Sequence, residues 1–127
     1  ISRMGAHMAR VLIIYDSPTE THRLTGMLKK NGYEVLAADS GEAGYSMALR
    51  EQPDAVLMDI VLPGVNGFQA TRQLSKASET EHIPVIIVTT KDQETDKVWG
   101  MRQGAKAYLT KPVNEKDLIS ILKEVIS

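Results

Sequence analysis

Five short apolar runs, separated by longer amphipathic stretches, constrain the fold of this chain more than any other feature of its sequence. Most of the runs lack polar alternation, and three are rich in Val and Ile, which is typical of strands buried on both faces of a parallel sheet. Neighbouring parallel strands need crossovers of about a dozen residues or more, and the gaps are long enough to hold helices. We therefore predict a doubly wound α/β fold, a five-stranded parallel sheet with five helices. The runs are residues 11–14, 34–37, 55–58, 85–88 and 107–109.

Capping residues predict where the helices begin and end. Ser17 and Pro18 suit the start of the first helix, and Glu20 can complete a capping box with Ser17. Gly32 suits a left-handed stop after this helix. The remaining helices are expected at residues 41–51 behind Ser40, 67–76, 92–103 and from 115 onward behind Asn114.

Composition narrows the class of protein. The 127 residues suit one domain, and 15 Lys+Arg against 16 Asp+Glu give a net charge of −1, which does not indicate a nucleic-acid partner. The absence of cysteine excludes disulfides and thiolate metal sites and fits a reducing cytoplasm. No apolar run approaches the roughly 18 residues of a membrane span. We expect residues 1–7 to be an expression-vector remnant and residues 8–127 to form the domain.

Polar side chains follow the predicted strands at their carboxyl ends. Asp16 follows the first strand, Asp59 the third, Thr89 the fourth and Lys111 the fifth. Ligands of open parallel sheets bind at this edge, so we expect the four side chains to converge on one crevice. Two carboxylates suit Mg²⁺, a lysine can neutralise phosphoryl oxygens, and an aspartate can accept a phosphoryl group. The set therefore suits phosphoryl transfer to an aspartate.

Each of these residues alone also has a plain structural explanation. Either aspartate can cap a helix, the threonine suits a strand, and a lysine before a proline is commonly solvated. Trp99 and the methionines are expected to serve packing. The site is favoured because the four groups fall at the same end of the sheet.

The motifs together resemble the response-regulator receiver domains of two-component signalling. Residues 58–64 read Met-Asp-Ile-Val-Leu-Pro-Gly and residues 108–112 read Tyr-Leu-Thr-Lys-Pro, in combination with Asp16 and Thr89. The resemblance covers the chain from Met8 and implies a flavodoxin-like fold with strand order 2-1-3-4-5.

Two further segments, residues 67–74 and 88–97, resemble the single-domain regulators of type IV pilus twitching motility. This resemblance implies a cytoplasmic phosphorelay protein that is not an enzyme acting on external substrates. It would receive phosphate from the histidine kinase of a chemotaxis-like system. It would then contact a downstream motility protein through its fourth helix, fifth strand and fifth helix, without binding nucleic acid.

The resemblance also assigns roles within the crevice. Asp59 would accept the phosphate, and Asp16, Asp59 and the backbone carbonyl of Val61 would hold Mg²⁺. Lys111 would pair with the phosphorylated Asp59, and Thr89 would swing toward the phosphoryl oxygen.

The resemblance implies further details beside the crevice. Tyr108 would be an aromatic switch whose rotamer follows Thr89, and the Lys111–Pro112 bond would be cis. Water must attack the acyl phosphate in line, and Val61 and Lys91, two residues after Asp59 and Thr89, would flank its approach and so affect phosphate lifetime. Valine cannot orient an attacking water, and Lys91 can cover the approach or pair with the phosphoryl group, so we predict slow self-dephosphorylation.

Tyr15 departs from the family pattern, which has two adjacent acids after the first strand. We expect weakened Mg²⁺ affinity, with the phenol lying across the crevice or turned outward. Tyr15 is the only support for the alternative of a phosphorylation-independent pseudo-receiver, an interaction module. A third class, a phosphatase with an aspartyl-phosphate intermediate, would carry a second acid where Val61 stands. The chain also lacks a glycine-rich phosphate loop.

Overall fold

The computed structural model describes residues 8–126, and the expected vector remnant at residues 1–7 lies outside them. Strands and helices alternate along the chain, as the sequence predicts. Among residues 8–126, no helix has the length and apolar character needed to cross a membrane. The elements are β1 (Arg10–Ile14), α1 (Pro18–Lys30), β2 (Glu34–Ala38), α2 (Gly41–Glu51), β3 (Ala55–Met58), α3 (Gly67–Lys76), β4 (Val85–Thr89), α4 (Glu94–Arg102), β5 (Ala107–Thr110) and α5 (Glu115–Ile126).

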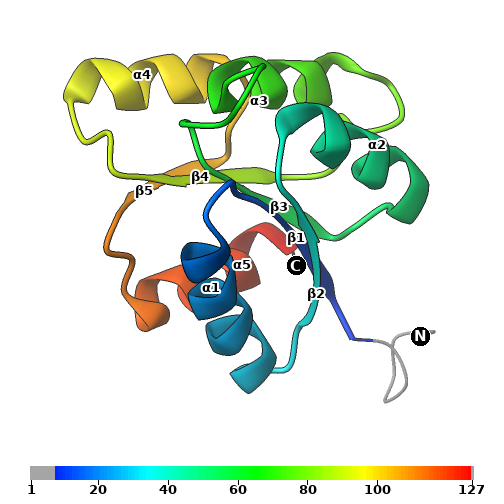
Figure 1. Cartoon of the computed structure of the whole chain (residues 1–127), viewed down its shortest axis with the longest axis vertical. Coiled ribbons are helices and arrows are strands. Elements are labelled where there is room, and N and C mark those ends of the chain that lie inside the picture. The colour runs from blue at the N-terminus through cyan, green and yellow to red at the C-terminus, as the bar shows by residue number, and fades with distance from the viewer. Residues whose placement is uncertain (1–7, 127) are drawn as a thin grey trace.

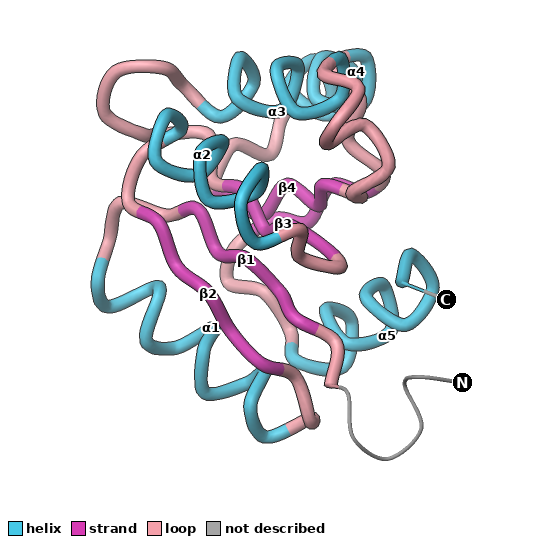
Figure 2. The backbone as a smooth tube through the Cα atoms, turned by 90° about the vertical axis from the view of Figure 1, so that its right-hand side faces the viewer, coloured by secondary structure: helices cyan, strands magenta, loops and turns pink. Residues whose placement is uncertain are grey.

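The five strands form one parallel sheet in the order β2-β1-β3-β4-β5. Helices α1 and α5 cover one face, and α2, α3 and α4 cover the other (Figures 1 and 2). This confirms the doubly wound fold and its strand order. The winding reverses between β1 and β3, so the carboxyl ends of these two strands border the crevice where ligands of such sheets bind.

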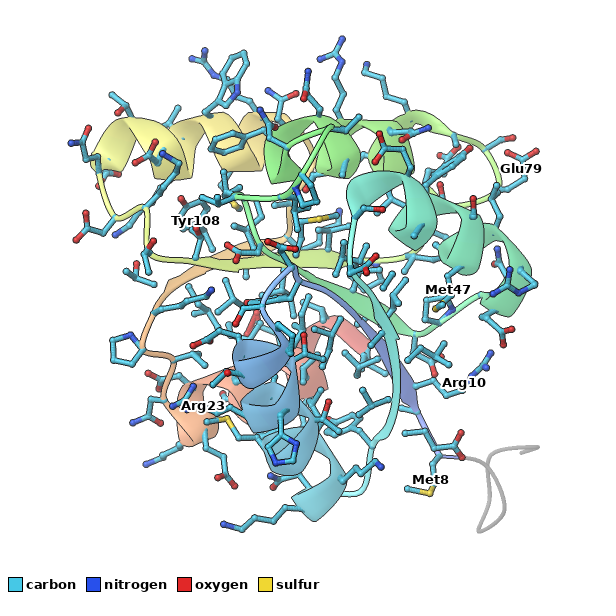
Figure 3. All side chains as sticks on the ribbon, viewed as in Figure 1. Met8, Arg10, Arg23, Met47, Glu79 and Tyr108 are labelled. Atoms are coloured by element: carbon cyan, nitrogen blue, oxygen red, sulfur yellow. The ribbon has the colours of Figure 1, made fainter. Side chains whose placement is uncertain are left out.

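Alternation along β1 divides the core into two layers. Val11 and Ile13 pack with residues of α1 and α5, whereas Leu12 and Ile14 pack with residues of α2 and α3. Successive side chains of a strand point to opposite faces, which accounts for the division. All four are fully buried, and burying such a side chain stabilises the fold by about 1.5–3 kcal/mol. Side chains fill both spaces beside the sheet (Figure 3).

Most predicted helix ends are confirmed, and two details differ. Ser17 Oγ accepts from the Glu20 amide (3.3 Å), and Gly32 has a φ of +87°. The Glu20 carboxylate, however, does not close a capping box but approaches a lysine of the crevice. Helix α4 begins at Glu94 rather than at residue 92, because the Gln93 amide donates to Asp96 Oδ2 (3.3 Å) and makes Gln93 the cap.

Gly67 allows α3 to start directly against the end of β3. Its amide donates to the carbonyl of Ile60 (2.8 Å). A Cβ atom at this position would overlap the backbone of Asp59 and Ile60. The glycine therefore brings α3 close enough to fix the backbone on which Asp59 stands.

Candidate functional site

Backbone pairing brings the ends of β1 and β3 together. The Asp59 amide donates to the carbonyl of Ile14 (3.1 Å), so Tyr15 and Asp16, which follow Ile14, lie beside Asp59. On the other side, the Lys111 amide donates to the Thr89 carbonyl (2.8 Å), which joins the ends of β4 and β5. The residues predicted from the strand ends are thus gathered at one edge of the sheet.

Asp59 occupies the centre of this edge. Only 8% of the residue is exposed. Its Oδ1 atom accepts from the Ile60 amide (2.8 Å), and its Oδ2 atom accepts from Lys111 Nζ (3.0 Å). Hydrogen bonds to a charged group are about twice as strong as neutral ones, so these contacts fix the orientation of the carboxylate.

Lys111 reaches into the crevice from the turn after β5. Its side chain is 13% exposed, and the Lys111–Pro112 peptide bond is cis, as the resemblance implies. Glu20 Oε1 of α1 lies 3.9 Å from Lys111 Nζ. Glu20, which the sequence indicates only as a helix-cap residue, therefore also lies at the site. Its spacing from Ser17 fits a cap equally well, so only the packing of α1 reveals the second contact.

Tyr15 is buried beneath the crevice, and of its two expected placements the outward-turned one is wrong. The residue is 1% exposed and belongs to the core between the sheet and helices α1 and α5. Its hydroxyl donates to the carbonyl of Val88 (2.7 Å), and Lys111 Nζ lies 4.6 Å from the ring centroid. Burial raises the pKa of Tyr15 well above its ordinary value, and the charges of Asp59 and Glu20 raise it further. The phenol is therefore a neutral donor that forms the floor of the crevice, neither turned outward nor open to solvent.

Thr89, Lys91 and Tyr108 form a connected group beside the crevice. Thr89 is fully buried, and its Oγ1 atom accepts from the Lys91 amide (3.4 Å). The Tyr108 hydroxyl donates to the Lys91 carbonyl (2.7 Å). A Cβ atom at Gly100 of α4 would contact the Tyr108 ring, which places the ring against α4 (Figure 3). Burial, with Asp96 and Asp92 adding, raises the pKa of Tyr108 to about 12.

Asp16 and Val61, the other two expected metal ligands, are both exposed, unlike Asp59. Asp16 is exposed and lines a hollow between α1, β2 and α2, while Val61 is 63% exposed. Within residues 8–126, no three His, Cys, Asp or Glu side chains converge as a metal cage. Two carboxylates and a backbone carbonyl are nevertheless suitable donors, since Mg²⁺ prefers oxygen and commonly keeps several waters. The donor set at the ends of β1 and β3 therefore fits Mg²⁺.

Helix α4 carries apolar side chains that do not pack into the core. Val98, Trp99 and Met101 are 44%, 49% and 46% exposed. The expectation that Trp99 serves packing is therefore wrong. The core contribution of this helix comes instead from the close approach of Gly100 to Ile87 and Tyr108.

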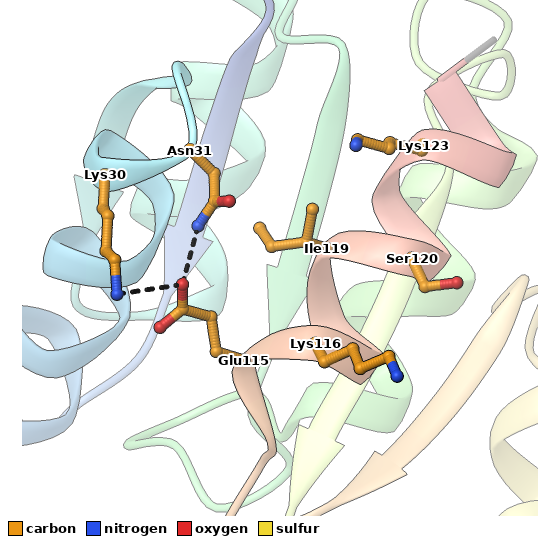
Figure 4. Close-up of a pocket in the computed structure, with 7 residues that line it drawn as sticks. All are labelled: Lys30, Asn31, Glu115, Lys116, Ile119, Ser120 and Lys123. Atoms are coloured by element: carbon orange, nitrogen blue, oxygen red, sulfur yellow. Dashed lines mark hydrogen bonds and ion pairs between the residues drawn. The ribbon is translucent and has the colours of Figure 1, made fainter.

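A separate hollow between α1 and α5 contains none of the crevice residues. It is lined by Lys30, Asn31, Glu115, Lys116, Ile119, Ser120 and Lys123 (Figure 4). Glu115 Oε2 accepts from Asn31 Nδ2 (3.0 Å) and lies 3.5 Å from Lys30 Nζ. The Asn31 hydrogen bond and the Lys30 charge lower the pKa of Glu115. These contacts tie the end of α1 to the start of α5.

Comparison with known proteins identifies the family of this chain. Residues 11–123 match the family described as the response regulator receiver domain. The chain therefore belongs to the response regulator receiver domain family. Members of this family are phosphoacceptor signalling modules that bind Mg²⁺ and interact with histidine kinases and downstream effectors.

Particular relatives refine this assignment. The chain is 63% identical over 120 residues to the protein PilH of Pseudomonas aeruginosa, a match that covers 94% of this chain and 99% of PilH. A CheY-like receiver domain protein from Methanospirillum hungatei superposes with a TM-score of 0.87 at 29% identity, over 94% of both chains.

The receiver domain of a sensor histidine kinase from Pseudomonas aeruginosa also has a TM-score of 0.87 at 29% identity. This match covers 94% of this chain and 98% of that one. That structure holds a magnesium ion coordinated in its active-site cleft. The chain is thus a response regulator receiver domain that is similar to PilH over nearly the whole length of PilH.

Proposed function

We propose that this protein accepts a phosphoryl group on Asp59 from a histidine kinase of a chemotaxis-like system in the cytoplasm. It then signals by protein contact in the control of type IV pilus twitching motility. The pilus assignment rests on the 63% identity to PilH. It acts as a phosphorelay protein without turnover of external substrates.

One observation carries the proposal, the hydrogen bond of 3.0 Å between Lys111 Nζ and Asp59 Oδ2. The ammonium stands where a phosphoryl group on Asp59 would bring new negative charge. A donor already in place at such a position needs little reorganisation during the transfer. Thr89, at the neighbouring strand end, offers a hydroxyl that can turn toward the same phosphoryl oxygens.

The transfer replaces one bond to phosphorus by another. A carboxylate oxygen of Asp59 attacks the phosphorus of the donor's phosphohistidine, a P–O bond forms, and the P–N bond breaks. The leaving ring nitrogen takes the electron pair of that bond and is protonated. Lys111 balances charge on the phosphoryl oxygens throughout, and the product is an acyl phosphate on Asp59.

Asp16, Asp59 and the carbonyl of Val61 would hold Mg²⁺ in this scheme. Magnesium, when bound, neutralises charge on the phosphoryl oxygens. Tyr15 contributes a neutral phenol whose hydroxyl is already bonded to Val88 (2.7 Å), so it offers the metal no charge. We therefore propose weaker Mg²⁺ binding than a carboxylate at this position would give.

The phosphorylated protein would contact its downstream partner through the face formed by α4, β5 and α5. The exposed Val98, Trp99 and Met101 of α4 support this proposal, because exposed apolar and aromatic side chains are typical of docking sites. The partner would be a downstream motility protein. Tyr108 links this face to the crevice through its hydrogen bond with Lys91.

Intact mass spectrometry after treatment with phosphoramidate and Mg²⁺ tests the phosphoacceptor role. The wild type should gain the mass of one phosphoryl group, and Asp59→Asn, which keeps the shape but removes the nucleophile, should gain none. No gain in the wild type at saturating Mg²⁺ would contradict the proposal and favour the pseudo-receiver. Continuous release of phosphate from an added phosphoester would instead indicate a phosphatase.

The pseudo-receiver alternative gains no support from these relatives. Tyr15 was its only basis. The retained Asp16, Asp59, Thr89 and Lys111 support the phosphoacceptor instead.

A further inference from the structure

Tyr15 is fixed more firmly than an aromatic side chain that only fills space. It continues the face of β1 that carries Val11 and Ile13, so its ring enters the layer beneath the sheet. The last pair between β3 and β4 joins Met58 to Ile87, so Val88 extends beyond the β3 ladder. The Tyr15 hydroxyl donates to the Val88 carbonyl at 2.7 Å. Both ends of the side chain are therefore anchored.

The ring supports the ammonium group of Lys111. Lys111 Nζ lies 4.6 Å from the ring centroid, within the range of a cation–π contact. Two carboxylates face the same ammonium, Asp59 at 3.0 Å and Glu20 at 3.9 Å. The ammonium is thus bounded by one aromatic face and by two acids at unequal distances.

We propose that Tyr15 is a positioning residue that holds Lys111 against Asp59. This inference rests on the proposed function, because Lys111 matters only if Asp59 carries a phosphoryl group. A ring face attracts a cation without neutralising it and without accepting one of its hydrogen bonds at a carboxylate. The ammonium therefore keeps its shortest contact for Asp59, while Glu20 remains a looser neighbour.

Comparison with a carboxylate at position 15 explains why a neutral ring favours the contact between Lys111 and Asp59. A third acid beside Lys111 would compete with Asp59 for the same charge, since opposite charges about 4 Å apart attract strongly in a sheltered site. The neutral phenol removes that competition, and its burial in the core, together with the bond to Val88, holds the ring in place. Compared with a carboxylate, Tyr15 thus attracts the metal less strongly but holds the Lys111 ammonium in a more fixed position.

Two variants separate the aromatic face from the hydroxyl. Tyr15→Phe keeps the ring, and Tyr15→Leu keeps an apolar side chain without a π face. In NMR spectra, the methylene protons next to the Lys111 ammonium should be shifted upfield by the ring current in the wild type and in Tyr15→Phe. They should return to ordinary positions in Tyr15→Leu. With phosphoramidate at saturating Mg²⁺, Tyr15→Leu should be phosphorylated about tenfold more slowly, and Tyr15→Phe within about threefold of the wild type.

Tyr33→Leu is the matched control, because Tyr33 is also buried in the core beneath the sheet at 9% exposure. It should leave the Lys111 signals in place and slow phosphorylation far less than Tyr15→Leu. Equal slowing by both variants would reduce Tyr15 to a packing role and overturn the inference.

The wild-type spectrum provides a test that does not depend on the folding of any variant. Ordinary Lys111 methylene shifts in the wild type would overturn the inference directly. Failure of the proposed function looks different, since the wild type would then take up no phosphoryl group while Lys111 still showed its upfield shift.

Discussion

At the residue scale, we expect Tyr15 to affect both the stability of the crevice and its affinity for Mg²⁺. A carboxylate about 5 Å from Mg²⁺ attracts it by roughly 2 kcal/mol even at the dielectric of water, which is more than tenfold in affinity. Tyr15→Asp should therefore bind Mg²⁺ at least about tenfold more tightly than the wild type. It should also melt lower without metal, because it adds a charge beside Asp59 and removes a ring from the core.

Tyr15→Asn separates charge from packing in this experiment, since it removes the same ring without adding a charge. Thermal melting with and without Mg²⁺ should show a larger gain from the metal in Tyr15→Asp than in Tyr15→Asn. Equal gains in the two variants would show that charge at this position does not reach the metal.

Tyr108 is expected to make the stability of the folded protein depend on pH in alkaline solution. Its hydroxyl donates to the Lys91 carbonyl, a bond that contributes about 1 kcal/mol. The folded protein holds this proton to a pH of about 12, above the ordinary tyrosine pKa of about 10. The contribution is therefore complete below a pH of about 10 and is lost as the pH rises through about 12.

Urea unfolding of Tyr108→Phe against the wild type measures this contribution. The variant should be less stable by about 1 kcal/mol at neutral pH, and the difference should shrink as the pH rises from about 10 to about 12. A difference that stays constant over this range would show that the phenol does not ionise there.

Single residues also show where sequence reasoning stops. Tyr15 follows the alternation of Val11 and Ile13, so the pattern of β1 already indicated the buried face. Its contact with Val88 was not predictable, because it depends on how far β4 extends past β3. The contact of Glu20 with Lys111 was not predictable either, because its spacing from Ser17 suits a helix cap and only tertiary packing brings it to Lys111.

At the scale of elements, β1, β3 and β4 were predictable because they are buried on both faces and read as apolar runs. The ends of α4 were less predictable. Its apolar residues follow no single stripe, and its core contact is made by Gly100, which carries no side chain that a pattern could register. The exposure of Trp99 was missed for the same reason.

The loop after β4 is expected to set the lifetime of the phosphoryl group. The Lys91 backbone is held at both ends, by Thr89 Oγ1 (3.4 Å) and by the Tyr108 hydroxyl (2.7 Å), and its side chain is exposed. A lysine so anchored can cover the approach of water to Asp59. Loss of phosphate, followed by intact mass over time, should be slow in the wild type and faster in Lys91→Ala.

The Lys91→Gln variant keeps most of the length without the charge and serves as the control. An intermediate rate would indicate that both coverage and charge contribute. A rate in Lys91→Ala that is unchanged or slower than in the wild type would refute the role given to Lys91.

At the scale of the whole molecule, one chain of contacts joins the crevice to α4. Thr89 contacts Lys91, Lys91 contacts Tyr108, and the Tyr108 ring packs against Gly100. Trp99 adjoins Gly100, is half-exposed and is the single tryptophan of the sequence. Its fluorescence therefore reports on this face without labelling.

Phosphorylation with phosphoramidate and Mg²⁺ should change the emission of Trp99 in the wild type, and the same treatment should leave Asp59→Asn unchanged. Mass spectrometry of the same samples verifies the extent of phosphorylation. Superimposable spectra of free and fully phosphorylated protein would contradict a signal that passes through α4.

The central claim is that Asp59 carries the phosphoryl group, and chemical mapping of that group tests it most directly. Borohydride reduces an acyl phosphate on aspartate to homoserine, which peptide mass spectrometry locates. After treatment with phosphoramidate and Mg²⁺, the account predicts homoserine at position 59 and at no other aspartate. Phosphorylated protein with an unmodified Asp59, or with homoserine at another position, would contradict it.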